Sequence, residues 1–392
     1  MVRSGLAVLV VALAALAPGA AGAADPLRIG FISTLSSPTS TAGPDMLEAW
    51  KLGLEEFGGK LGGRAVELFV EDDQMKPDVG VQLARKMLDE KKVNLITGTV
   101  LSNVMLAEAH TILPRKTFIL SINAGPSLLA GKECSPYLFV ASYQSDTPAE
   151  AAGIYLRKQG VKKVSIIAPN YTAGRDILTG FKRGYASPVA SENYTPLDQF
   201  DFAAELAEIR NASPDAVFFF YTSGAPSTNF VKQYAEAGLK GKIPLYGVAF
   251  SLDELTLPGM GDAAIGIKDG TFWTADMDNP ANHAFVAHFE ATYHHRPSIF
   301  AAHAYDGVRM LNAALTAVKG EIENADAFRA ALKTVKFDSV RGHFRFNRNQ
   351  FPIQDLHLAE VVKDKSGAPI NTYRELIEKD HQDAYVGECK MD

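Results

Sequence analysis

The run Leu27-Arg28-Ile29-Gly30-Phe31-Ile32-Ser33 gives the clearest indication of the fold class. Its apolar run is short and ends in polar residues, as expected for a strand that is buried on both faces. A loop of Ser, Thr, Pro and Gly follows at 36–44, and Asp45 can then cap a helix. That helix places its apolar residues at helical spacing, at Met46, Trp50, Leu54 and Phe57. This order of strand, polar loop and helix is typical of an α/β sheet.

The same alternation of short apolar runs and amphipathic stretches continues along the chain. We expect further strands at 66–70, 93–97 and 118–121 and, in a second series, at 163–168, 216–221 and 243–248. Such alternation predicts parallel sheets that helices cover on both faces. The strands are too many for one small sheet, so we predict an α/β fold of two doubly wound parallel-sheet lobes. No Pro- or Ser-rich linker separates them, which favours packed lobes joined by short hinges.

Composition excludes several classes of protein. The 392 residues are 47% hydrophobic and 21% charged, which fits neither a disordered chain nor a coiled coil. Lys and Arg number 39 against 45 Asp and Glu, so the net charge is −6. This acidic balance leaves no electrostatic footprint for nucleic acid and argues against broad adhesion to anionic lipid.

The first 24 residues have the pattern of a secretory signal peptide. Arg3 precedes the apolar run 6–16, and a stretch of small residues at 19–24 supplies an A-x-A-like cleavage site. A membrane anchor is the alternative, but the run is shorter than the ~20 residues that a spanning helix needs. We therefore predict residues 1–24 to be a cleaved signal peptide and the mature protein to be periplasmic.

Small and hydroxylated residues recur where the predicted strands end. In open α/β sheets, ligands bind outside the carboxyl ends of the strands, close to the N-termini of helices. The strand ends of the first series carry 36–40, 98–103 and 121–125, and those of the second carry 170–174, 221–224 and 247–250. A helix cap explains any single Ser or Thr, but their recurrence predicts a ligand-binding cleft.

Motifs of catalysis and of cofactor or metal binding are missing from the sequence. It contains no phosphate-binding loop, no H-E-x-x-H and no G-x-S-x-G. His283, His288, His294 and His295 cluster without the i, i+4 spacing of a helical metal site, and no Cys joins them. The carboxylate pairs at 72–73 and 253–254 are adjacent residues, which point in different directions. We therefore expect a protein that is not an enzyme and that uses no cofactor and no metal.

The chain contains two cysteines, Cys134 and Cys389. In an exported protein such a pair usually forms a disulfide, which here would tie the C-terminal tail to the body. Closing so long a loop would restrict the unfolded chain by on the order of 4–5 kcal/mol in the entropy model. Two unrelated free thiols are the alternative.

The mature chain resembles the type I periplasmic solute-binding proteins, the Leu/Ile/Val-binding family of ABC importers. The residues that carry the resemblance are Ile29–Ser33 with its Ser-rich loop, Ile96–Thr99, Ser121–Ser127, Tyr143–Pro148 and Pro297–Gly307. Each motif is short, but their order along one chain is specific. The resemblance implies two lobes joined by three hinge crossovers. It places residues 25–143 and 274–348 in an N-terminal lobe, and 144–273 and 349–392 in a C-terminal lobe with its tail.

The resemblance also implies a set of ligand-binding residues. Ser102 matches the position whose hydroxyl holds a ligand carboxylate, and 123–125 matches the loop that completes this grip, although Gly125 stands where the family often has Thr. Tyr171 and Tyr221 match aromatic positions of the second lobe. The full set of expected site residues is Ser36, Ser37, Thr39, Ser102, Asn103, Asn123, Ala124, Gly125, Tyr171, Tyr221, Thr222, Ala249 and Phe250.

One departure from the family pattern bears on the ligand. Amino-acid binders carry an acidic residue near Ala249 or Phe250 that pairs with the ligand's ammonium, and this sequence has none there. Burying an unpaired ammonium costs several kcal/mol. We therefore predict a small carboxylate with an aromatic body, of the benzoate or cinnamate type. The alternatives are a branched-chain or other amino acid, which Asp253 could reach, and a ligand-sensing domain of the same fold. The expected partner is a membrane permease, with no nucleic acid, and a monomer is expected.

Overall fold

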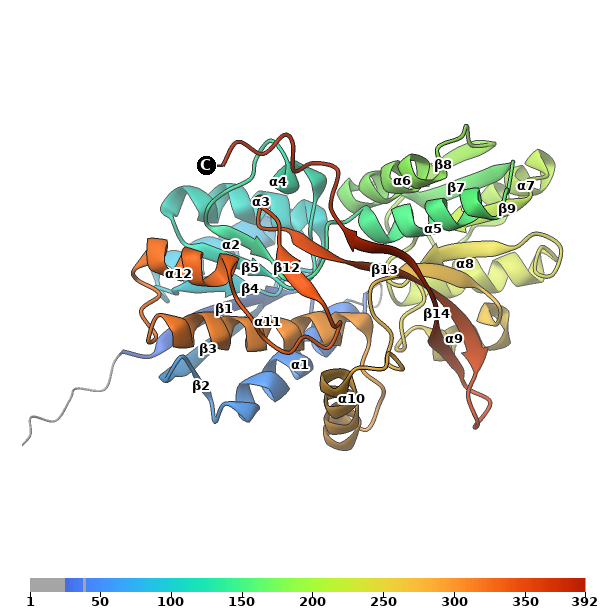
Figure 1. Cartoon of the computed structure of the whole chain (residues 1–392). Coiled ribbons are helices and arrows are strands. Elements are labelled where there is room, and N and C mark those ends of the chain that lie inside the picture. The colour runs from blue at the N-terminus through green and yellow to red at the C-terminus, as the bar shows by residue number, and fades with distance from the viewer. Residues whose placement is uncertain (1–24, 38–39, 392) are drawn as a thin grey trace, which may run out of the picture.

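The computed structural model describes residues 25–37 and 40–391, which form two α/β lobes side by side (Figure 1). The predicted signal peptide 1–24 and Thr39 lie outside the described residues. Within the described part of the chain, no helix combines the length and the apolar character that crossing a bilayer requires.

The first lobe is built on a six-stranded sheet in the order β2-β3-β1-β4-β5-β6. Its strands are β1 (Leu27–Ser33), β2 (Lys60–Leu61), β3 (Arg64–Asp72), β4 (Leu95–Thr97), β5 (Phe118–Ser121) and β6 (Leu138–Val140). All pairs are parallel except β2 with β3. Strand β1 lies in the centre, between β3 and β4, and six of its seven residues are buried. Its continuous apolar run therefore forms the buried strand that the sequence predicts.

Helices cover both faces of this sheet. They are α1 (Ala42–Glu56), α2 (Pro77–Asp89), α3 (Ser102–Ile112), α4 (Ser127–Ala130), α10 (Pro280–Tyr293), α11 (Ile299–Ala317) and α12 (Ala325–Lys333), with a 3-10 turn at Leu113–Arg115. On one face, Trp50 of α1 packs with Phe31 of β1 and with α11. On the other face, Met87 of α2 and Met105 of α3 share a cluster with Ile96 and Ile119. The first lobe is therefore doubly wound.

The second lobe is built on an eight-stranded sheet in the order β12-β13-β11-β10-β9-β7-β8, with β14 also paired to β13. Its strands are β7 (Val164–Pro169), β8 (Ser191–Thr195), β9 (Ala216–Phe219), β10 (Leu245–Val248), β11 (Lys268–Thr271), β12 (Phe344–Phe346), β13 (Pro352–Lys363) and β14 (Pro369–His381). Its helices are α5 (Thr147–Lys158), α6 (Thr172–Tyr185), α7 (Ala203–Ala212), α8 (Ala225–Glu236) and α9 (Leu257–Met260), with a 3-10 turn at Gly261–Ala264. Strands β7 to β11 are parallel, and β12 to β14 add antiparallel pairs.

The chain passes between the two sheets three times, at 141–146, 272–279 and 334–343. These are the three crossovers that the resemblance implies. The exact lobe boundaries stay predictions, although β12, which the boundary after 348 assigns to the first lobe, pairs with β13 of the second sheet.

The C-terminal tail returns from β14 to the first lobe (Figure 1). Cys389 forms the expected disulfide with Cys134, 255 residues away in the sequence. The side chain of Asn349 donates hydrogen bonds to Asp383 of the tail at 3.0 Å and to the carbonyl of Ala130 at 2.9 Å. The tail, which the sequence analysis grouped with the second lobe, is therefore fastened to the first, since a covalent link and buried polar contacts hold it there.

Each sheet has a topological switch point. In the first sheet, β1 has β3 on one side and β4 on the other, and in the second sheet β7 lies between β8 and β9. The loops that leave neighbouring strands at such a point diverge to opposite faces, which opens a crevice at the carboxyl ends of the strands. The segments after β4 and β9 each lead from this crevice into a helix, at Ser102 and Ala225.

Candidate functional site

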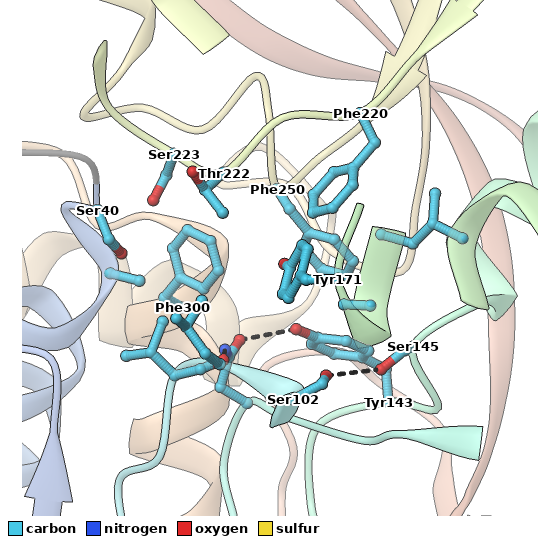
Figure 2. Close-up of a pocket in the computed structure, with 16 residues that line it drawn as sticks. Ser40, Ser102, Tyr143, Ser145, Tyr171, Phe220, Thr222, Ser223, Phe250 and Phe300 are labelled. Carbon is cyan, nitrogen blue, oxygen red and sulfur yellow. Dashed lines mark hydrogen bonds between the residues drawn. The ribbon is translucent and has the colours of Figure 1, made fainter. Parts of the chain in front are cut away.

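A cavity lies between the two lobes and contains about 430 Å³ of empty space, including its opening to solvent. Ser40, Ala42, Val100, Leu101, Ser102, Asn123 and Phe300 line it from the first lobe, Tyr143 and Ser145 from the first crossover, and Tyr171, Ala173, Ile177, Phe220, Thr222, Ser223 and Phe250 from the second lobe. Figure 2 shows these side chains converging on the cavity.

The N-terminus of α3 supplies the polar end of the cavity. Ser102 is the first residue of this 11-residue helix, and Leu101 at the N-cap provides no side-chain hydrogen bond to its first turn. The hydroxyl oxygens of Ser102 and Ser145 lie 3.4 Å apart (Figure 2). Because a helix N-terminus presents unpaired N–H groups and partial positive charge, this end of the cavity favours an anion.

Asn123 and Tyr143 form a fixed pair beside this polar end. The Asn123 side chain donates to the carbonyl of Val100 at 2.7 Å and accepts a hydrogen bond from the Tyr143 hydroxyl at 2.8 Å. The Tyr143 ring stacks on Phe250, with centroids 4.4 Å apart, and on Phe272 at 5.2 Å. Burial raises the pKa of the Tyr143 phenol well above its usual value, so the group stays neutral.

Aromatic rings form the opposite wall. Tyr171 precedes α6 and Phe220 follows β9, and their rings lie nearly parallel with centroids 6.3 Å apart. Phe250 follows β10 and lies 6.2 Å from Phe300, in the first turn of α11. Burial raises the pKa of Tyr171. The wall therefore offers uncharged aromatic faces against which a planar apolar group can pack.

A second group of hydroxyls lies away from the α3 end. Ser40 of the first lobe and Thr222 and Ser223 of the second gather there (Figure 2). The backbone N–H of Thr41 donates to the Ser223 hydroxyl at 3.4 Å, which links the two lobes at this point. The cavity thus has polar groups at two ends and aromatic rings between them.

Charged side chains are absent from the described lining of this cavity. Asp253, the nearest acidic residue that the sequence offered for an ammonium, lines a separate small cavity with Ala249 and Glu254. Its carboxylate accepts hydrogen bonds from the backbone of Leu255 at 3.0 Å and the Thr256 hydroxyl at 2.6 Å, and burial raises its pKa to about 6.

The structure brings five of the predicted site residues to the cavity: Ser102, Asn123, Tyr171, Thr222 and Phe250. Tyr221 and Ala249 face elsewhere. The Tyr221 ring packs in the core of the second lobe, and its hydroxyl lies 3.2 Å from that of Thr195. Because successive residues of an extended chain point to opposite sides, Phe220 lines the cavity in place of Tyr221. Phe250 lines it from the turn that follows β10.

The other predicted positions serve the walls and loops around the cavity. The hydroxyl of Ser36 donates to Asp72, and that of Ser37 lies 2.8 Å from the sulfur of Met75. Asn103 and Ala124 do not reach the lining, and Thr39 lies outside the described residues. A Cβ atom at Gly125 would lie 2.0 Å from the carbonyl oxygen of Tyr143. Glycine is required here because the first crossover packs directly on this loop, which leaves no room for a threonine.

Eleven of the sixteen lining residues were missed as site residues, and four of them shape the two ends and the aromatic wall: Tyr143, Ser145, Phe220 and Phe300. Tyr143 and Phe300 lie within motifs that carry the family resemblance. Those motifs indicated the region of the chain, but they did not identify these two residues as ligand contacts. Phe220 lies one residue from a predicted position, and an alternation test along 216–221 would have found it. Ser145 also lies within such a motif, Tyr143–Pro148, but its place in the cavity depends on the course of the first crossover.

Known proteins share this sequence and architecture. A family model described as "Periplasmic binding protein" matches residues 26–367. Leu/Ile/Val-binding protein homolog 6 of Brucella melitensis biotype 1 is 26% identical over 384 residues, which cover 94% of this chain and 97% of that protein.

Two solved ABC-transporter solute-binding proteins superimpose on the whole fold. One, from R. palustris in complex with benzoate, has a TM-score of 0.87 and 30% identity, and the match covers 94% of this chain and 100% of that one. The other, from Rhodopseudomonas palustris BisB5 in complex with 3,4-dihydroxy benzoic acid, has a TM-score of 0.86 and 29% identity, with coverages of 92% and 99%. The chain therefore belongs to the periplasmic binding protein family, as a type I solute-binding protein of the class that serves ABC transporters.

Proposed function

We propose that the cavity binds a small aromatic carboxylate of the benzoate type and that the protein delivers it to the permease of an ABC importer. The observation that carries this proposal is the lining itself, which joins a helix N-terminus and hydroxyls at one end to uncharged aromatic rings.

Each part of such a ligand finds a matching group. The carboxylate accepts hydrogen bonds from Ser102, Ser145 and the free N–H groups of α3. Because the acceptor is charged, these hydrogen bonds are stronger than hydrogen bonds to a neutral acceptor. The ring packs between Tyr143, Phe250 and the other aromatic side chains. The ligand's charge is thus held by dipoles and donors, without a cationic side chain in the described lining.

The two solved relatives bound to benzoate and to 3,4-dihydroxy benzoic acid support this ligand class. The hydroxyls of Ser40, Thr222 and Ser223 lie away from Ser102 and Ser145. A ring hydroxyl on the side opposite the carboxylate would meet them. We therefore expect 4-hydroxybenzoate to bind more tightly than benzoate, by the ~1 kcal/mol of a typical hydrogen bond.

Closure of the lobes retains the ligand. The backbone N–H and the hydroxyl of Ser127 in the first lobe donate to Asp176 of α6 at 2.9 and 2.7 Å, and Thr41 reaches Ser223. A ligand that contacts both walls favours this arrangement by its differential affinity for the closed form. The closed form is the one we expect the permease to bind.

A branched-chain amino acid is the second candidate, because the curated relatives are named Leu/Ile/Val-binding protein homologs. Its carboxylate would use the α3 end equally well. Its ammonium would face rings and hydroxyls, since Asp253 lies in another cavity and is held by its own loop. The unpaired ammonium disfavours this ligand by several kcal/mol.

A thermal-shift panel separates the two candidates. Benzoate, 4-hydroxybenzoate and leucine are added to ligand-free protein at equal concentrations, and the midpoint of unfolding is recorded. A ligand at 100 times its Kd stabilises the native state by about 2.7 kcal/mol. The proposal predicts a rise with the aromatic acids and none with leucine. A rise with leucine alone would establish the amino-acid function instead, and unchanged recovery of the bound acid after long incubation separates binding from turnover.

A further inference from the structure

Three side chains that are distant in the sequence meet outside the ligand cavity. Asp45 and Glu48 lie three residues apart on α1, and His295 comes from the loop between α10 and α11. One ligand atom from each lies within 4.8 Å of those of the other two. We propose that Asp45, Glu48 and His295 form a binding site for Zn²⁺.

Asp45 supplies a carboxylate oxygen that lacks any other partner. The residue is 2% exposed, and both the backbone N–H and the hydroxyl of Ser298 donate to its Oδ2. Its Oδ1 is buried and accepts no hydrogen bond. An unsatisfied carboxylate oxygen in the interior is costly, and a cation beside it removes that cost. Ser298 meanwhile orients the carboxylate, as outer groups do for metal ligands.

His295 has the hydrogen-bond arrangement of a metal-binding histidine. Its Nδ1 lies 3.1 Å from the carbonyl oxygen of Arg296, so Nδ1 must carry a proton and donate it. In the neutral ring, Nε2 then presents its lone pair, and it lies 3.0 Å from Oε2 of Glu48, another acceptor. Two acceptors facing each other require a positive charge between them. A proton on Nε2 meets this need, and so does a metal ion that both atoms bind.

The donor set selects the ion. One imidazole nitrogen and two carboxylate oxygens suit Zn²⁺, whereas Ca²⁺ and Mg²⁺ prefer oxygen ligands alone. Zinc lies about 2.0–2.2 Å from such atoms, which places tetrahedral ligands about 3.4 Å apart. The three groups need only small side-chain shifts to reach this spacing. Glu48 and His295 have side chains that are 37% and 34% exposed, so a water molecule can complete the coordination.

The charge of the three groups also suits a divalent cation. Asp253 of the second lobe adds negative charge that acts on Asp45. Arg296, which follows His295, pairs with Glu290 at 3.5 Å. Two carboxylates and a neutral imidazole carry a charge of −2, which Zn²⁺ balances.

Titration calorimetry with zinc chloride tests the proposal on chelator-treated, ligand-free protein. We expect one Zn²⁺ per chain, and at least a tenfold loss of affinity in Glu48→Gln and in His295→Gln. His283→Gln is the matched control, because this exposed histidine on α10 lies outside the cluster and pairs with Asp278 at 3.8 Å. The control should bind zinc like the wild type.

Two further measurements keep the test decisive. Zinc should raise the unfolding midpoint of the wild type and of His283→Gln but not that of Glu48→Gln, whose substitution lies at the helix surface and leaves the Asp45–Ser298 contacts in place. Cobalt(II) in place of zinc should give visible absorption that His295→Gln abolishes. Absence of zinc uptake by the wild type, or equal uptake by all the variants, would overturn the proposal and leave only an ion pair between Glu48 and His295.

Discussion

The two walls of the cavity are backed by different interiors. Behind the first-lobe wall, Glu108 of α3 is 1% exposed, and its carboxyl accepts a hydrogen bond from the hydroxyl of Thr99. Behind the second-lobe wall, Tyr221 lies among aromatic side chains, with ring centroids 4.7 Å from Phe202 and 5.1 Å from Phe230. One wall therefore rests on buried polar groups and the other on an apolar core.

This difference explains how each lobe contributes to ligand recognition. Polar groups on the first wall need partners that hold them in one orientation, and Asn123, fixed between Val100 and Tyr143, shows how the interior supplies them. The aromatic rings of the second wall need a fixed shape, which close packing provides without hydrogen bonds. The first lobe should thus determine the charge of the ligand, and the second its aromatic body.

The largest expected effect concerns the buried acid behind the first wall. Burial raises the pKa of Glu108 to about 8 from its ordinary 4.5. The folded state then retains a proton that the unfolded chain releases, so the free energy of unfolding falls as the pH rises from about 4.5 to 8. Glu108→Gln removes this slope. Relative to the wild type, the variant should gain on the order of 4 kcal/mol between pH 4 and pH 8.

Urea unfolding at several pH values checks this prediction. Other buried acids add their own slopes in both proteins, so the difference between wild type and variant isolates Glu108. Glu55→Gln, a substitution at an exposed position of α1, should follow the wild-type curve. A Glu108→Gln curve parallel to that of the wild type would mean that the acid is ionised within the first lobe at neutral pH, and the contrast between the two interiors would be lost.

The next largest effect is expected for a variant that removes the preference of the first wall for an anionic ligand. Ser102→Asp places a carboxylate at the N-terminus of α3, where the helix dipole offsets part of the cost of burying its charge. It also occupies the position that we assign to the ligand's carboxylate. We expect the affinity for benzoate to fall at least 100-fold, or about 3 kcal/mol. Ser102→Asn, of similar size and neutral, should cost only about tenfold, and equal losses in the two variants would contradict an anion at this end.

Much of the fold and part of the cavity lining could be predicted from the sequence. The run Leu27–Ser33 and its repeats along the chain predicted two parallel α/β lobes, because a strand buried on both faces has no polar alternation. The polar residues at strand ends predicted the cleft, and Ser102 was placed in it, because the first turn of a helix after a buried strand must lie at the carboxyl edge of the sheet.

The rest depended on contacts that the sequence does not encode locally. Which of Phe220 and Tyr221 faces the cavity depends on where β9 ends, and the predicted strand was two residues longer than the observed one. Ser145 reaches Ser102 only through the course of the first crossover. The sequence analysis placed His295 only among neighbouring histidines, whereas its ring contacts Glu48 of α1, 247 residues away in the sequence. Local periodicity predicts elements, whereas tertiary packing decides which side chains meet.

A smaller effect tests the second wall. Phe250→Ala removes a ring that stacks on Tyr143 and lines the cavity. The loss of this contact should weaken benzoate binding by about 2 kcal/mol, or 30-fold. Phe250→Leu keeps much of the apolar volume and should lose less. Calorimetric titration measures both variants, after a check that their unfolding midpoints remain high. If both bound benzoate as the wild type does, the second lobe would not hold the aromatic body.

The smallest expected effect tests which residues of the second lobe line the cavity and which belong to the core behind it. The hydroxyl of Tyr221 lies 3.2 Å from that of Thr195 and points into the lobe, away from the cavity. Tyr221→Phe should therefore leave the affinity for benzoate within twofold of the wild type and lower the free energy of unfolding by about 1 kcal/mol, the value of one buried hydrogen bond. Thr222→Val, one residue on and in the cavity lining, is the matched comparison. If the ring hydroxyl of 4-hydroxybenzoate contacts the hydroxyls of Ser40, Thr222 and Ser223, Thr222→Val should lower the affinity for 4-hydroxybenzoate more than the affinity for benzoate. A loss of affinity in Tyr221→Phe but not in Thr222→Val would mean that the strand end is turned by one residue in the ligand-bound protein, which would bring the predicted tyrosine to the ligand after all.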